Sequence, residues 1–171
     1  AVKGSEQTTI IFAGDRWANF AGNGLGFNQW MPLSFNGNTP RFHSLSAWTL
    51  DATSGRWSVA PQNNWVLNPT FEADRISVTT PVGWKATNGT NPDNDRRTGN
   101  RSWQLNGTAS LTQSIAGLPE GKYTLSVWTK SSGTGAQLSV RNHGGGDKMT
   151  AIPAATSWAR VTVSDIDVSS G

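Results

Sequence analysis

Apolar and polar residues alternate one by one along several short segments, and this two-residue period limits the fold more than any other feature of the sequence. In residues 123–130 the first, third and fifth residues are apolar, so they would share one face of a β-strand. Residues 111–115, 136–141 and 158–164 follow a similar pattern. Spacings of three and four residues, which mark an amphipathic helix, do not persist anywhere. Because turns rich in Gly, Asn and Pro separate the segments, the sequence predicts an all-β fold, an antiparallel β-sandwich.

The first part of the chain has a different pattern from the rest. Two apolar runs, 8–12 and 29–35, precede a predicted hairpin over 48–59. Three or four strands with so few apolar positions are marginal alone, so we expect this block to belong to something larger. A polar stretch then follows, and we predict two regions, 1–60 and 61–171.

Composition excludes several classes of function. The chain has no cysteine, which rules out disulfides, cysteine-bound zinc and thiol catalysis. No run of about 18 apolar residues exists to span a membrane. The basic cluster at 96–101 is interleaved with Asp93 and Asp95, which is typical of a solvated loop and not of a nucleic-acid surface. We therefore expect neither a nucleic acid nor a membrane as partner.

Nine tryptophans in 171 residues point to carbohydrate recognition. Indole faces pack against the C–H faces of sugar rings, while neighbouring polar side chains bond the hydroxyls. Trp128 is the leading candidate, because it lies on the polar side of its predicted strand, where a large ring stays exposed unless something covers it. The alternative is that a neighbouring loop or the N-terminal block covers this ring. The side chains predicted to bond sugar hydroxyls are Gln137, Ser139, Arg141 and Gln104, the alternative being an ordinary solvated face.

Other residues are expected to be structural. Trp84 and Trp103 are predicted to lie in the core.

Glycoside hydrolysis needs two carboxyl groups about 5–10 Å apart. Asp165 and Asp167 would share one strand face about 6.6 Å apart, but exposed strand carboxylates are common. No acidic pair has a recognisable catalytic context, so the sequence assigns no catalytic residue.

From residue 65 onward, an ordered series of motifs resembles the jelly-roll carbohydrate-binding modules of the family 4/9/22 type. The series comprises 67–72 (Leu-Asn-Pro-Thr-Phe-Glu), Gly83-Trp84, 101–105, 111–115, 118–123, and Trp158 with the alternating Val that follow. It covers about 100 residues. The resemblance implies a jelly roll whose concave sheet face binds sugar. It also implies a structural Ca²⁺ near Glu72, although the late Asp of that site is missing before Gly171.

The N-terminal block resembles the end of the five-bladed propeller of family 43 glycoside hydrolases, in particular exo-galactanase-like members. The matching motifs are Gly14-Asp15-Arg16-Trp17, 30–33 and the 48–57 hairpin. The family's catalytic carboxylates lie in earlier blades that are absent here. The resemblance implies that Asp15, Arg16, Trp17 and Trp30 could line a pocket rim; alternatively, Asp15 and Arg16 form an ion pair that braces the end of a blade.

The leading functional expectation is therefore a carbohydrate-binding region of a secreted polysaccharide-degrading enzyme. Its partners would be a polysaccharide or oligosaccharide and the remainder of the parent hydrolase, of which this chain is expected to be a piece. The first alternative is a part of an active exo-galactanase or arabinan-type glycosidase. The second is a structural or adhesion sandwich with no glycan role.

Overall fold

The computed structural model describes residues 1–16, 27–43, 45–74 and 76–169. Every strand pairing in this part of the chain is antiparallel, and it contains no helix, so the all-β prediction is confirmed. It accordingly holds no helix long and apolar enough to cross a membrane. Two compact units form: Ala1–Asn91 with Trp103–Gln113, and Pro92–Ser102 with Ser114–Gly171. The boundary predicted after residue 60 stays a prediction.

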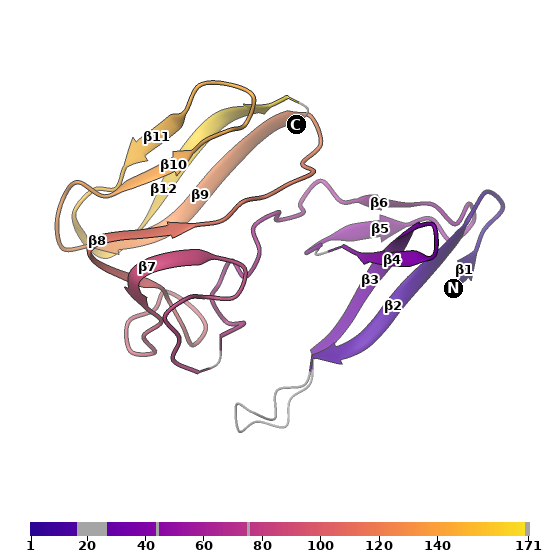
Figure 1. Ribbon diagram of the computed structural model, residues 1–171, viewed down its shortest axis with the longest axis horizontal. Coiled ribbons are helices and arrows are strands. Elements are labelled where there is room, and N and C mark those ends of the chain that lie inside the picture. Colours follow the sequence, from indigo (N-terminus) through magenta and orange to yellow (C-terminus); the bar gives the residue numbers. More distant parts are fainter. Residues whose placement is uncertain (17–26, 44, 75, 170–171) are drawn as a thin grey trace. The chain divides into compact units, whose positions relative to one another are not determined.

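A four-stranded sheet dominates the first unit (Figure 1). Its order is β1 (Val2–Lys3), β2 (Thr8–Arg16), β3 (Phe27–Asn36) and β4 (Thr39–Phe42). The strands follow one another in the sequence and in the sheet, as in a simple meander. Both predicted apolar runs lie in this sheet, the first in β2 and the second in β3.

The two faces of this sheet differ in burial. Thr9 and Pro32 are buried on one face. The pairing of Ile10 with Leu33 places both on the other face. There the rings of Phe12 and Phe42 meet edge to face with centroids 5.3 Å apart. Four side chains of that face are exposed large hydrophobics: Ile10, Phe12, Phe35 and Phe42.

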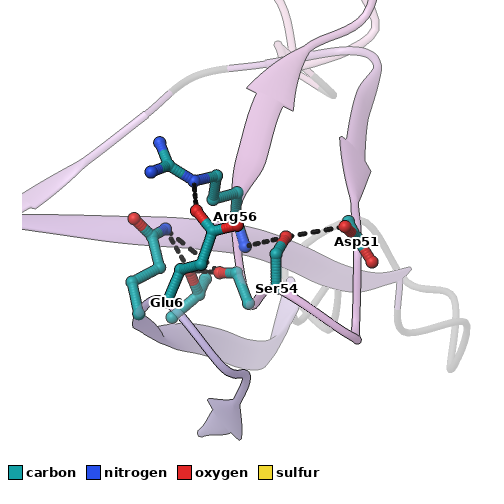
Figure 2. Close-up of polar contacts among 7 residues, drawn as sticks. Glu6, Asp51, Ser54 and Arg56 are labelled. Atoms are coloured by element: carbon teal, nitrogen blue, oxygen red, sulfur yellow. Dashed lines mark hydrogen bonds and ion pairs between the residues drawn. The ribbon is translucent and has the colours of Figure 1, made fainter.

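The predicted hairpin consists of β5 (Trp48–Leu50) and β6 (Trp57–Val59), and polar side chains hold its turn together (Figure 2). Asp51 accepts hydrogen bonds from the Ser54 hydroxyl at 2.6 Å and the Thr53 amide at 2.9 Å. These bonds, the Ser54 one foremost, hold the pKa of the Asp51 carboxyl below its usual value. These hydrogen bonds thus favour the ionised form of the Asp51 carboxylate.

The turn between β1 and β2 packs against the β5–β6 turn. The amides of Glu6 and Gln7 both donate to the Ser54 carbonyl at 3.0 Å, and Glu6 pairs with Arg56 (Figure 2). Gly55 has φ +79°, and a β-carbon there would collide with the Gln7 carbonyl oxygen. Only glycine therefore fits position 55 without strain.

The rest of the first unit is β7 (Lys85–Thr90) paired with β8 (Gln104–Thr112). The strand predicted over 111–115 is wrong in its bounds, since β8 ends at Thr112. The physical reason lies in Gln113, whose side chain accepts from the Leu67 amide at 2.8 Å and donates to the Gly83 carbonyl at 2.8 Å. Gln113 thus anchors an irregular segment instead of continuing the ladder.

Trp84 and Trp103, which were predicted to lie in the core, belong to this unit and pack against a third ring. Both are half-buried, and Phe71 lies between them, with ring centroids 5.8 Å and 6.2 Å away. Gly89 allows the closest contact, because a β-carbon there would meet the Trp103 ring. The three rings form a small cluster beside β7.

The second unit contains two pairs of strands: β9 (Gly121–Ser131) with β12 (Ala155–Val168), and β10 (Gln137–Val140) with β11 (Lys148–Ala151). Its core contains the buried side chains of β12, which are Val161, Val163 and Ile166. Val161 and Val163 follow the alternation expected for 158–164.

A bulge interrupts β12 near its end. The register shifts between Val163 and Ile166, and Asp165 has φ +54°. The regular strand geometry that was predicted to relate Asp165 and Asp167 is therefore wrong. The bulge inserts one extra residue, which interrupts the two-residue alternation at this point. Asp167 instead pairs with Lys122 at 2.8 Å.

Candidate functional site

Trp128 lies near the C-terminal end of β9, and its side chain is on the polar face of the strand. The core-side neighbour Val127 is paired with buried Val161, so the next residue must point the other way. Trp128 is 42% exposed. The sequence prediction that this indole faces outward is thus consistent with its place in the second unit.

One face of this indole is covered by a loop of the same unit. The guanidinium carbon of Arg97 lies 3.8 Å from the centre of the Trp128 ring, a stacked cation–π contact. Two residues away on the strand, Lys130 Nζ contacts both carboxylate oxygens of Asp95, at 2.8 and 2.9 Å. The loop 92–102 is therefore held against the polar face at two points. A neighbouring loop thus covers one side of the Trp128 ring, which was the alternative prediction for this residue.

A second arginine lies on the neighbouring strand, directly across from Trp128. Arg160 is the direct cross-strand partner of Trp128, so the two side chains share a face. Its Nη2 donates to the Ser126 hydroxyl at 2.9 Å. We call the surface formed by Ser126, Trp128, Lys130, Arg97 and Arg160 the Trp128 platform. It combines one apolar plate with several hydrogen-bond donors, the chemistry that a sugar ring and its hydroxyls require.

The other predicted ligand residues lie elsewhere. Gln137 and Ser139 are exposed on β10, whereas their neighbour Leu138 is half-buried. Thr150, paired with Leu138, donates to the Thr162 carbonyl at 3.2 Å, so this side of the hairpin is turned toward β12. Among the described residues, no hydrogen bond or ion pair joins Gln137 or Ser139 to the Trp128 platform.

Arg141 and Gln104 are also outside the platform's contacts. Arg141 follows β10 and lies 3.5 Å from the Asp147 carboxylate. Gln104 begins β8 in the first unit and is exposed. Both stay predictions as sugar-binding residues.

The predicted hydrolase rim lies at the end of the β2–β3 pair. Asp15 pairs with Asn28 through the backbone, and Arg16 pairs with Phe27. Trp17 lies outside the described residues. Trp30 is 63% exposed, and its carbonyl accepts a hydrogen bond from Trp48 Nε1 at 3.1 Å. The rim assignment stays a prediction.

The predicted Ca²⁺ site would use Glu72, which is half-buried in an irregular turn. The next acidic residue in the sequence, Asp74, is buried, and it accepts from the Val82 amide at 2.9 Å and from Asn68 Nδ2 at 2.9 Å. Within the described residues, no group of three or more His, Cys, Asp or Glu could hold a metal. Since Ca²⁺ usually takes six to eight oxygen ligands, Glu72 would need mainly backbone carbonyls, and the site stays a prediction.

Sequence reasoning missed Arg97 and Arg160. Arg97 belongs to the cluster that was assigned to a solvated loop, and nothing in a sequence tells which strand such a loop folds over. Arg160 does carry a signal, because its alternation places it on the polar side of 158–164. Finding its neighbour would have required the register between β9 and β12.

Comparison with protein-family models, with curated proteins and with solved structures finds no match for this chain.

Proposed function

We propose that this chain is a carbohydrate-binding region of a secreted polysaccharide-degrading glycoside hydrolase, and that glycan binds at the Trp128 platform. The observation that carries the proposal is the outward indole of Trp128, exposed on a strand face that is otherwise polar. Leaving such a ring in water is unfavourable, and a pyranose covering it would remove apolar area from solvent.

The platform supplies the polar half of such a site. Arg160 and Ser126 lie on the same strand face as the ring, and Arg97 stacks on it. Their donors can bond ring hydroxyls and orient a sugar over the indole. A binding module needs only weak affinity, because tethering raises the local concentration of the enzyme at its substrate.

Finer architecture is part of the same proposal: a jelly roll for 61–171, with Ca²⁺ at Glu72, and a terminal propeller blade for 1–60. A propeller blade is a four-stranded antiparallel sheet, and the four-stranded antiparallel sheet of β1 to β4 supports this part of the proposal. The exposed apolar side chains of that sheet, among them Phe35 and Phe42, support a blade that packs against a neighbour. Buried Val161 and outward Trp128 support a sheet with one core face and one ligand face.

Affinity electrophoresis through gels containing β-1,3-galactan, arabinan, xylan, β-glucan or the acidic polygalacturonate tests the proposal. At least one polysaccharide should retard the parent chain, and Trp128→Ala should abolish the retardation. Phe35→Ala is the matched control, because it removes an exposed ring from the other unit and should leave retardation unchanged. Failure of every polysaccharide, acidic ones included, would contradict glycan binding, and equal retardation of Trp128→Ala would contradict the platform.

A further inference from the structure

We infer that the glycan recognised at the Trp128 platform carries carboxylates, that is, uronic acid residues. This inference rests on the proposed function and adds the substrate class. The observation behind it is that the platform carries two guanidinium groups, Arg97 on the ring and Arg160 on the facing strand. A neutral sugar needs hydroxyl partners, whereas fixed cations beside an aromatic plate select an anionic sugar.

Arg97 is positioned to act as an anion receptor. Its guanidinium stacks on the indole, with 3.8 Å between the guanidinium carbon and the ring centre. Stacking leaves the N–H groups of a planar guanidinium at its edge, where they point away from the ring. The described residues place no carboxylate in ion-pair distance of Arg97.

Arg160 supplies a second cation on the same face. It is exposed, it faces Trp128 across the β9–β12 pair, and one of its nitrogens donates to the neutral Ser126 hydroxyl. No described carboxylate pairs with Arg160 either. A guanidinium has five N–H donors, so most of this group's donors remain for a ligand.

The nearby acids do not cancel these charges. Asp95 is bound by Lys130, and at the far end of the strand pair Asp167 is bound by Lys122, each at 2.8 Å. Asp95 and Asp167 are thus each bound by a lysine, and no described carboxylate lies in ion-pair distance of either arginine. One guanidinium on the indole and a second on the same strand face, at Ser126, fit the planar carboxylate of a uronate, which guanidinium groups bind through paired hydrogen bonds.

Single-stranded nucleic acid is the other anionic ligand that arginine and aromatic groups bind. Such sites stack successive bases on several rings along a basic groove. The platform has one ring, Trp128, and its basic loop also carries Asp93 and Asp95. Uronate glycans therefore fit better, and an oligonucleotide becomes an outcome of the test.

The experiment measures affinity for polygalacturonate, alginate and glucuronoxylan, each compared with its carboxyl-reduced, neutral form. At least one acidic polymer should bind the parent chain about tenfold more tightly than its reduced form, as expected when a charge-assisted pair is lost. Added salt should weaken only the acidic interaction.

Variants assign the effect to the platform. Arg97→Gln and Arg160→Gln should each lower affinity for the acidic polymer about tenfold and leave the reduced form unchanged. Arg41→Gln removes the same charge from the first unit and should change neither. Arg160→Lys keeps the charge but loses the fork, so it should fall between parent and Arg160→Gln. Circular dichroism checks that each variant is folded.

Equal affinity for acidic and reduced polymers would overturn the inference, as would parent-like affinity in both glutamine variants. If that equal affinity disappears in Trp128→Ala, glycan binding survives and only the substrate class fails. Absence of binding to both series would overturn the inference, and it would contradict glycan binding as well only if no polysaccharide retarded the chain in electrophoresis. Tighter binding of an oligo(dT) 20-mer than of any polyuronate would also overturn the inference.

Discussion

The guanidinium of Arg97 lies flat over the indole of Trp128, its carbon atom 3.8 Å from the ring centre. The stack joins a loop to a strand more than thirty residues later in the sequence. It keeps the ring in a fixed position while the remainder of its surface stays open. A preorganised aromatic plate loses little entropy on binding a sugar.

Removing this stack should loosen the loop. We expect Arg97→Ala to lower the free energy of unfolding by about 0.5–1 kcal/mol, the range for an exposed cation–π contact. Amides of 92–102 should exchange faster with solvent, whereas β10 amides should not change. Unaltered exchange throughout the loop would show that the stack does not hold it.

Glycine 55 should be essential for the docked turns of the first unit. Gly55→Ala adds a β-carbon that collides with the Gln7 carbonyl at φ +79°. The left-handed backbone alone costs about 1–3 kcal/mol for a non-glycine residue, and the collision adds to it. Gly37→Ala is the matched control, since φ is +58° there and the space is open. Urea unfolding should show a larger loss for Gly55→Ala, and equal losses would contradict the docking.

Acid should weaken the β5–β6 turn through Asp51. Hydrogen bonds from Ser54 and Thr53 lower the pKa of this carboxyl in the folded state, so the unfolded state binds its proton first as pH falls. The contribution is therefore complete above the unfolded pKa of about 3.9 and disappears as pH falls through the lower folded pKa. The stability difference between parent and Asp51→Asn should shrink from pH 6 to pH 2. A constant difference would contradict this account.

His43 should titrate below an ordinary histidine. Burial, and then the nearby Arg41 charge, lower its pKa, and its Nε2 lies 2.8 Å from the Ser34 hydroxyl. The unfolded state takes the proton first, so stability should fall as pH drops below about 6.5 and level off beneath the folded pKa. NMR titration of the ring should show a midpoint below 6.5, which Arg41→Gln should raise. A midpoint that Arg41→Gln leaves unchanged would contradict the charge effect.

Strands and turns were largely predictable because they depend on local periodicity and turn chemistry. The alternation in 123–130 became the regular part of β9, and the 48–59 hairpin formed as expected. The end of β8 was not predictable, because it depends on Gln113 binding a distant backbone segment. The bulge at Asp165 likewise breaks an alternation that looked regular in the sequence.

The candidate site was predictable only in part. The outward direction of Trp128 follows from pleat geometry, so its strand pattern was enough. Arg97 reaches the ring through loop geometry, and Arg160 through strand register; neither is encoded in local spacing. The hairpin residue Gln137 shows the opposite case. Its side chain is exposed on β10, as the alternation predicts, yet no described hydrogen bond places it at the platform.

The indole N–H signal of Trp128 offers the most direct test of glycan binding. A two-dimensional ¹⁵N–¹H NMR titration should use an oligosaccharide from a retarding polysaccharide, with the signal assigned by Trp128→Phe. The account predicts that this resonance shifts most among the tryptophans, while that of Trp30, 63% exposed in the other unit, stays in place. An unmoved Trp128 signal, with Trp30 shifting instead, would contradict the platform and favour the hydrolase rim.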